Sequence, residues 1–187
     1  MKLSSLLFLA LIALPSVSFA ELKDENLLYE LPSGYKVDFQ SKQGNVITME
    51  MVPQSETVND WTEMLTVQIL LGQKKFTPEQ FQTLMSKSWL AVCKDGGVGP
   101  ITKGEENGYP FSIWLQMCPQ NPLTGKPENT WLKAIKGNDS LYVIQKAFRF
   151  DPSEEQVVQW MKYFRSVMVC DSRLSDRPCP KVEKVAQ

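Results

Sequence analysis

The stretch ETVNDWTEMLTVQILLG, residues 56–72, crowds Asp60, Trp61 and Glu63 together and then becomes an apolar run. It is therefore either a catalytic corner or a strand of a sheet. Read with period two, Trp61 and Glu63 share one face with alternate apolar residues, whereas Asp60 lies on the other face. The pattern predicts a strand whose two carboxylates cannot act together without a bulge. Glu63 is then out of pattern, and an inward carboxylate needs a partner such as a lysine or backbone amides.

Apolar residues alternate in the same way in five further stretches of the chain. Such alternation is typical of strands that bury one face. The turn KGNDS, residues 136–140, separates the last two stretches and favours a hairpin, because Gly and Asn tolerate positive φ. The alternating stretches contain Tyr35, Val37 and Phe39; Ile47, Met49 and Met51; Phe111, Ile113, Leu115 and Met117; Trp131 to Ile135; and Leu141 to Phe148.

Two segments carry the signature of a capped helix. In FTPEQFQTLMSKSWLAVC, Thr77 is a good N-cap and Gln80 completes a capping box. In FDPSEEQVVQWMKYFRSVMVC, Asp151 is the expected N-cap and Glu154 completes the box. Helical spacing predicts a buried stripe in the first segment at Phe81, Leu84, Met85, Trp89 and Val92, and in the second at Val157, Trp160, Met161, Phe164 and Val167.

The order of these elements predicts the fold class. Strands come in runs that one helix interrupts and a second helix closes, which is typical of antiparallel pairing. We therefore predict an α+β domain in which two main α-helices pack on a mostly antiparallel β-sheet of about six to seven strands.

Two stretches, residues 94–108 and 119–130, are dense in Gly, Pro and Asn. This composition predicts no regular element in either one. Long tethered loops commonly carry a binding surface, so both are candidate binding loops. The alternative is that each is only a connection on the surface of the domain.

The first twenty residues have the composition of a secretory signal peptide. A lysine precedes the apolar run Leu6–Leu14, and small residues mark a cleavage site after Ala20. The run is too short to span a membrane, which takes about 20 apolar residues. We predict a chain that is periplasmic or secreted, does not insert into a membrane, and forms a single domain over residues 21–187 with a short tail from about residue 171.

Four cysteines in the exported part predict two disulfides, since an oxidising compartment favours their formation. Three pairings are possible. We favour Cys93 with Cys118 and Cys170 with Cys179, because each pair is near in sequence and flanks a loop rich in turn residues. A zinc site of four thiolates is the alternative, but the chain has no CxxC spacing and no histidine.

Charge and histidine content narrow the chemistry. The net charge of −1 provides no field that would attract nucleic acid. The absence of histidine removes Ser-His-Asp and Cys-His catalysis and the commonest general base. A hydrolase without histidine would have to use a pair of carboxylates. Carboxylates are, however, also common on the solvent-exposed faces of strands that have no catalytic role. We predict no catalytic residue, metal or cofactor, and the carboxylates considered are Asp38, Glu50, Glu63, Glu105 and Glu106.

Three tryptophans, Trp61, Trp114 and Trp131, lie in predicted strands. An exposed ring on a sheet can stack on a sugar or a base, whereas a ring under a helix or at a sheet edge belongs to the packing. These three residues and Glu63 are the candidate binding residues. Trp89 and Trp160 lie on helix stripes and are expected in the core.

One strand and the order of elements carry a resemblance to known proteins. The strand has the pattern V-x-D/N-W-T-E-M-x-T-x-Q, which resembles small exported Gram-negative proteins of unassigned function. Strands, a helix, further strands and a final helix resemble the Mog1/PsbP-like fold. That resemblance implies accessory or binding proteins: PsbP-like proteins bind an assembly at a membrane surface and Mog1-like proteins bind a small GTPase. It implies no catalytic residue here. The pattern is carried by Val58, Asp60, Trp61, Thr62, Glu63, Met64, Thr66 and Gln68.

Three hypotheses of function follow. The first is an exported, non-enzymatic binding or accessory protein of a Gram-negative bacterium, with a protein partner in the envelope or in a host. A type II system is a candidate export route, and the protein is also a candidate virulence factor. The second is a carboxylate-based hydrolase or carbohydrate-binding protein that acts on cell-surface polysaccharide. The third is a structural component of the envelope.

Overall fold

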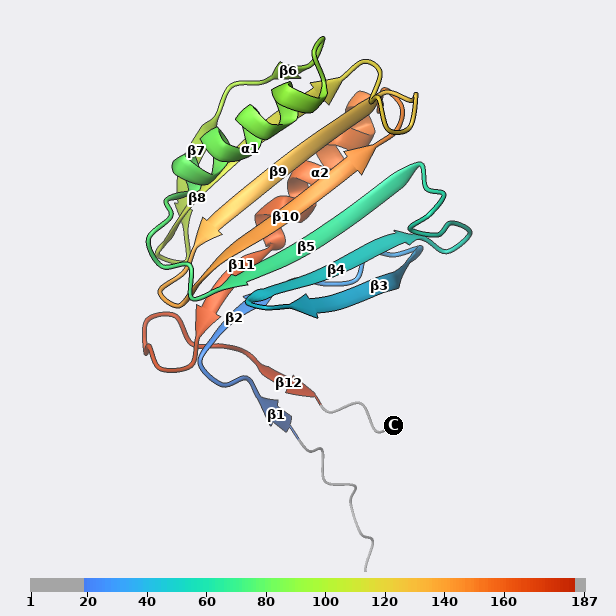
Figure 1. Cartoon of the computed structure of the whole chain (residues 1–187). Coiled ribbons are helices and arrows are strands. Elements are labelled where there is room, and N and C mark those ends of the chain that lie inside the picture. The colour runs from blue at the N-terminus through green and yellow to red at the C-terminus, as the bar shows by residue number, and fades with distance from the viewer. Residues whose placement is uncertain (1–18, 184–187) are drawn as a thin grey trace, which may run out of the picture.

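A computed structural model describes residues 19–183 of the chain. The predicted signal peptide lies outside the described residues, apart from its last two positions. These two positions belong to β1 (Phe19–Glu21), which pairs with β12 (Lys181–Glu183) to form a separate two-stranded sheet (Figure 1). Within residues 19–183, no helix combines the length and apolarity needed to cross a membrane.

In the described part of the chain, the main sheet has eight strands, all paired antiparallel, in the order β3-β4-β5-β10-β9-β8-β6, with β7 also paired to β8 (Figure 1). All six predicted strands are present, so the predicted α+β class is confirmed. The strands are β3 (Tyr35–Gln43), β4 (Val46–Pro53), β5 (Glu63–Leu71), β6 (Gly97–Val98), β7 (Thr102–Glu106), β8 (Tyr109–Cys118), β9 (Glu128–Lys136) and β10 (Ser140–Phe148); a further pair joins β2 (Glu25–Leu28) to β11 (Met168–Asp171).

The prediction that residues 94–108 hold no regular element is wrong, because β6 and β7 lie there. Gly104 explains how β7 pairs closely: a Cβ at this position would come within 2.6 Å of the Phe111 ring. Pairing with β8 also satisfies the backbone of this glycine-rich segment. The second stretch is irregular until β9 begins at Glu128, so its last three residues are strand.

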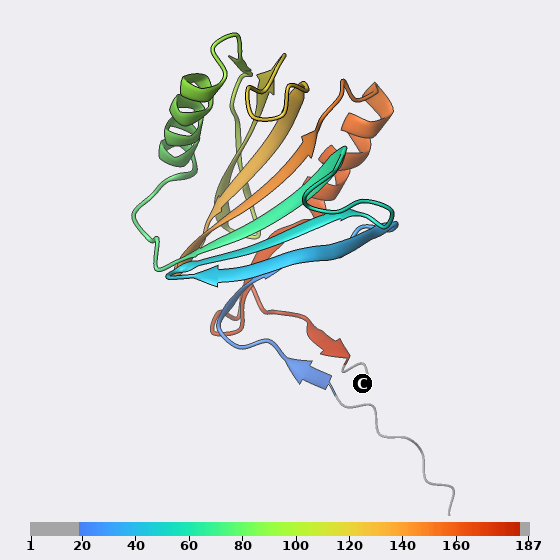
Figure 2. The same cartoon turned by 45° about the vertical axis from the view of Figure 1, so that its right-hand side comes forward.

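Two helices pack on opposite faces of the sheet, α1 (Pro78–Val92) on one side and α2 (Glu154–Ser166) on the other (Figure 2). Neighbouring strand residues show this directly. Ile144 belongs to the core under α2, whereas Val143 belongs to the core under α1. Because consecutive side chains of a strand point to opposite faces, the two helices sandwich the sheet.

The predicted capping box of α1 is confirmed, with Thr77 as N-cap and Gln80 as its partner. The predicted cap of α2 is wrong by two residues. Ser153 is the N-cap, and its hydroxyl accepts from the backbone N–H of Gln156. The carboxylate of Asp151 accepts instead from the side-chain amide of Asn129 on β9. Serine is as good an N-cap residue as aspartate. The side chain of Asp151, the predicted cap, is instead used in the contact with β9.

The two helices bury different shares of their predicted stripes. In α2, Trp160 and Phe164 lie in the larger core. In α1, Phe81 is buried, but the predicted inward positions Leu84 and Val92 are 49% and 52% exposed. The stripe of α1 is therefore wrong at these two positions, because α1 lies across only part of its sheet face.

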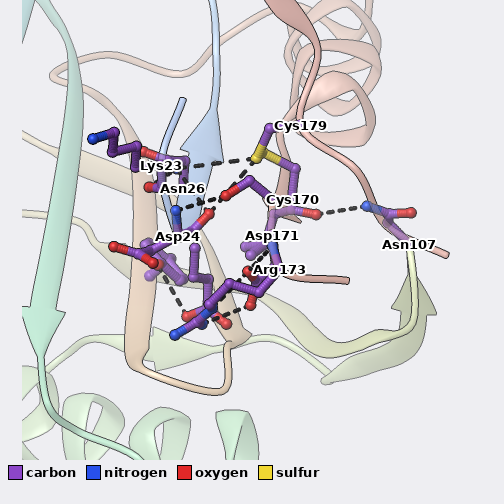
Figure 3. The surroundings of a disulfide bond; sticks show 12 residues. Lys23, Asp24, Asn26, Asn107, Cys170, Asp171, Arg173 and Cys179 are labelled. Carbon is purple, nitrogen blue, oxygen red and sulfur yellow. Dashed lines mark hydrogen bonds and ion pairs between the residues drawn. A yellow bond between two sulfur atoms is a disulfide. The ribbon is translucent and has the colours of Figure 1, made fainter. Parts of the chain in front are cut away.

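The two predicted disulfides, Cys93–Cys118 and Cys170–Cys179, are both present. The first joins the end of α1 to the end of β8. The second links β11 to the segment after it, in a network with the turn before β2 (Figure 3). There Arg173 donates to the carboxylate of Asp171, which directly follows Cys170. These links hold the predicted tail against the domain, and disulfides fit an exported protein.

Candidate binding face

Helix α1 covers only part of its face of the sheet. It packs over β8, β9 and the adjoining side of β10, where Phe81 meets Trp114, Leu132 and Val143. Figure 2 shows α1 beside these strands, while β3, β4 and β5 extend beyond it. The uncovered part of this face is the candidate site, and we call it the open face.

The open face is polar, whereas the other side of the same strands is apolar. On β5, Leu65 and Val67 point into the core under α2, while Thr66 and Gln68 point to the open face. All of its residues except Phe39 are half-buried or better. The open face consists of Phe39, Ser41, Thr48, Glu50, Thr66, Gln68 and Gln145.

A directed chain of hydrogen bonds crosses three strands of this face. The Gln145 amide on β10 donates to the Gln68 carbonyl oxygen over 3.2 Å. The Gln68 amide on β5 in turn donates to the Thr48 hydroxyl on β4 over 3.4 Å. Among residues 19–183, the carbonyl oxygen of Gln145 and the hydroxyl hydrogen of Thr48 have no partner, so both can bond a ligand.

A hollow of about 400 Å³ lies at the outer end of the open face. A β-bulge shapes it: the register of β3 shifts between Val37 and Phe39, so Asp38 lies outside the regular ladder. The prediction that Tyr35, Val37 and Phe39 share one face is therefore wrong at Phe39, which the extra residue turns to the open face. The hollow is lined by Phe39, Ser41, Gln43, Val46, Thr48 and Gln68.

Glu50 is the carboxylate on the open face. It lies opposite Phe39 on β3 and Thr66 on β5. Partial burial raises the pKa of its carboxyl above the ordinary value, because desolvation disfavours the charged form. Glu50 therefore places on this face a carboxyl group whose oxygens can accept hydrogen bonds from a ligand.

The other carboxylates considered from the sequence do not join Glu50. Glu63 and Glu106 form ion pairs with Lys146 and Lys133 on the α2 side. Asp38 accepts from the backbone N–H of Val58 over 2.8 Å. Among residues 19–183, no group of three or more acidic or cysteine side chains could hold a metal ion.

Glu63 is satisfied by a lysine, one of the two kinds of partner that the sequence predicts for it. Its Oε2 accepts from the Lys146 Nζ over 2.8 Å and from the Tyr35 hydroxyl over 2.7 Å. Trp61 lies before β5 begins and packs with Met64 on the opposite side of the sheet. The predicted common face of Trp61 and Glu63 is thus wrong, since alternation starts only at Glu63.

The candidate binding residues lie in separate places. Trp61 is 8% exposed, with the Arg149 guanidinium 3.7 Å from its ring centroid. Trp114 is 1% exposed beneath α1. Trp131 is half-buried on the α2 side, edge to face with Phe148. None of these three rings nor Glu63 lies on the open face. Sequence reasoning missed that face because polar alternation looks the same on any wetted strand.

The class that this architecture defines is an α+β protein with one antiparallel sheet between two helices. Its fold is similar to that of three solved structures. The Ran-binding protein Mog1p of Saccharomyces cerevisiae has 13% identity and a TM-score of 0.46 over 79% of this chain and 85% of that one. LpqN of Mycobacterium tuberculosis, described as involved in cell envelope biogenesis, has 9% identity and a TM-score of 0.48 over 83% and 91%. PsbP of Synechocystis has 11% identity and a TM-score of 0.45 over 82% and 95%.

The likeness to these proteins is one of fold alone, and it is the Mog1/PsbP-like resemblance that the order of elements suggests. No protein-family model matches the sequence, and no curated protein matches it.

Proposed function

We propose that this chain is an exported, non-enzymatic binding or accessory protein of a Gram-negative bacterium, and that a protein partner docks on its open face. The observation that carries the proposal is that α1 leaves part of its sheet face uncovered, with a hollow of about 400 Å³ beside β3. The partner belongs to the envelope or to a host, and the protein acts in the periplasm or after secretion. A type II system, which moves folded proteins, suits a chain with two disulfides.

The chemistry of the open face supports a partner that is recognised by hydrogen bonds rather than by charge. The residues that line the hollow are uncharged, and several are amides and hydroxyls. Such groups give orientation and specificity without long-range attraction. The loop of residues 119–130 is a second contact area in this proposal, since Leu123 at its tip is 85% exposed.

The test compares capture of partners by the predicted mature chain, residues 21–187, and by its variants. Envelope and culture-supernatant fractions of the native host are passed over each immobilised protein. Gln68→Lys places a charge in the hollow and is expected to abolish capture of the specific partner. Gln159→Lys makes the same change at an exposed position of α2 and should leave capture intact. Equal capture by wild type and Gln68→Lys would remove the open face from the proposal.

A further variant examines the second contact area. Replacing residues 119–130 by a Gly/Ser segment of equal length is expected to weaken capture without abolishing it. Comparing the two fractions identifies the compartment at the same time. A partner found only in the supernatant favours a secreted protein, and one found only in the envelope favours a periplasmic protein.

Carbohydrate binding is the second candidate function, and the hydrogen-bond chain from Gln145 to Thr48 favours it. Rows of amides and hydroxyls suit sugar hydroxyls, and Glu50 adds a carboxyl with a raised pKa. A glycan array with wild type and Thr48→Val, joined to a hydrolysis screen with Glu50→Gln, tests this candidate. If the wild type binds no glycan on the array and hydrolyses no substrate in the screen, this candidate function is excluded.

A further inference from the structure

The two ends of the main sheet differ in what they offer to a partner. At one end β7 has five residues, and its Lys103 forms an ion pair with Glu79 of α1. At the other end β3 has nine residues, and β4 is the strand that it pairs with in the described part of the chain. Figure 1 shows β3 at the outer border of the sheet. A very short strand protects an edge, whereas a long edge strand presents a longer row of unpaired N–H and C=O groups.

The bulge at Asp38 divides β3 into two parts. The first part is blunted, because Asp38 lies outside the ladder and its carboxylate is held by Val58 N–H and by an ion pair with Lys36. The second part, Phe39–Gln43, pairs with β4 at every residue without a further shift. Only this second part has the regular backbone that another strand needs.

The side chains of that regular part form the wall of the hollow. Phe39, Ser41 and Gln43 are alternate residues of β3, and all three line it. Phe39 is 40% exposed, so its ring is accessible to a group that lies against this edge. An extended chain laid beside β3 would present every second side chain to the same face, next to these residues.

We infer that the edge of β3 at residues 39–43 binds an extended segment of the partner polypeptide as an added strand. The inference rests on the proposed function, because the partner is the protein that docks on the open face. Main-chain hydrogen bonds along the edge provide affinity, and the hollow selects one side chain of the segment. The lining of the hollow is uncharged, so the selected side chain is uncharged as well.

The probe is a phage-displayed library of random 12-residue peptides, selected on residues 21–187 of the protein. Enriched peptides are synthesised, and their affinity and their effect on amide hydrogen exchange are measured. The expected result is slower exchange at amides within residues 39–43 and an uncharged residue shared by the enriched peptides. Failure to enrich any peptide, or protection confined to another surface, would overturn the inference.

Two adjacent proline variants separate pairing from folding. Successive N–H groups of a strand point to opposite sides, so one of Gln40→Pro and Ser41→Pro removes a bond to β4 and the other removes only an outward donor. The variant that keeps the thermal midpoint identifies the outward N–H. That variant should bind the enriched peptide at least tenfold more weakly than wild type. Unchanged binding by it would contradict strand addition.

A matched pair of alanine variants tests the contribution of the hollow. Phe39→Ala should weaken binding about tenfold, because its ring borders the selected side chain. Val37→Ala changes a residue with similar exposure that does not line the hollow, and it should stay within about twofold. Equal effects of the two substitutions would sink the assignment of the hollow.

Failure of this inference can be told from failure of the proposed function. If Gln68→Lys loses the host partner while the tolerated proline variant keeps it, the open face binds the partner without strand addition. If both variants keep the partner, both proposals fail. Sedimentation of wild type and of the proline variant tests whether a second copy of the chain binds at the edge instead. A wild-type dimer that the proline substitution abolishes would show this, and it would overturn the inference.

Discussion

The two faces of the main sheet treat polar side chains in opposite ways. The face under α2 encloses Lys133 and Lys146, each fully buried and each paired with a carboxylate. The open face leaves amides and hydroxyls partly exposed, joined by one chain of hydrogen bonds. Burying a charge is costly unless its partners are in place, so the face under α2, which we call the closed face, allows one arrangement of its strands and helix. Among the described residues, the open face has no buried charge that would impose an arrangement, and it remains available to a ligand.

Lys146 is surrounded by aromatic rings and one ion pair. Its Nζ donates to Glu63 over 2.8 Å and to the Tyr35 hydroxyl over 2.7 Å. The same nitrogen lies 4.0 Å from the centroid of Trp160 on α2 and 4.5 Å from that of Phe148. The cluster therefore ties β10 to β3, β5 and α2. Burial lowers the pKa of Lys146 to about 8, while Glu63 acts in the opposite direction.

Lys133 contacts the C-terminal end of α2. Its Nζ donates to the carbonyl oxygens of Phe164 and Val167 over 2.6 and 2.9 Å, and it pairs with Glu106 of β7. The last carbonyls of a helix lack partners inside the helix, and a cation there also interacts favourably with the helix dipole. The two lysines thus contact α2 at its middle, through Trp160, and at its C-terminal end.

The largest effect is expected when one buried charge loses its partner. Glu63→Ala should lower the free energy of unfolding by about 3–5 kcal/mol, because Lys146 stays buried without a counter-ion. Urea unfolding followed by tryptophan fluorescence measures the loss. The double variant Glu63→Ala/Lys146→Met is the control, since it removes the charge as well and should regain most of the stability. Equal losses in the single and the double variant would mean that the pair is not what holds this face.

Lys133→Met should cost about 2–4 kcal/mol, because two buried carbonyls at the end of α2 lose their donor. Hydrogen exchange of the last turn of α2 should become faster in this variant. Lys162→Met, on the exposed side of the same helix, is the matched control and should stay within about 0.5 kcal/mol. A small loss for Lys133→Met would show that water replaces its contacts.

The buried lysine and the half-buried tyrosine of the closed face should make the stability of the protein depend on pH. Because the pKa of folded Lys146 is lowered to about 8, the unfolded chain binds more protons than the folded chain above that pH. Stability should therefore rise between pH 8 and 10, by about 1–2 kcal/mol. Above pH 10 the raised pKa of Tyr35 acts in the opposite direction, since the unfolded tyrosine loses its proton first.

Thermal midpoints across this pH range measure the change. Lys146→Met should show a smaller rise, and the remaining part comes from Lys133, whose pKa burial also lowers. A profile for Lys146→Met that is identical to the wild-type profile would contradict the assignment of this effect to Lys146.

The sequence predicts those features that depend on local patterns. Alternation places all six long strands, near spacing gives both disulfides, and Thr77 caps α1 as expected. The period-two pattern also singles out Glu63 as a buried carboxylate that needs a partner. Each of these features can be predicted from a few neighbouring residues or from the number of residues between two cysteines.

Features that depend on tertiary context could not be predicted. The bulge that turns Phe39 has no distinct residue signature, and β6 and β7 form in a glycine-rich stretch because β8 is there to pair with them. The open face depends on where α1 lies across the sheet. Gln116 and Gln68 look alike in the sequence, yet α1 covers the first and leaves the second partly exposed.

Substitution of these two glutamines compares the uncovered and the covered part of one sheet face directly. The smallest change in stability is predicted for Gln68. Both lie on the α1 side of the sheet, but Gln116 is 1% exposed beneath α1. Gln68→Ala should change stability by no more than about 0.5 kcal/mol, because water can replace its hydrogen bonds. Gln116→Ala should cost about 1–3 kcal/mol, since buried polar neighbours lose a partner that water cannot supply. Urea unfolding of both variants measures the difference. If Gln68→Ala proves as costly as Gln116→Ala, the open face is part of the folded scaffold, and its polar side chains are then held for stability rather than left free for a partner.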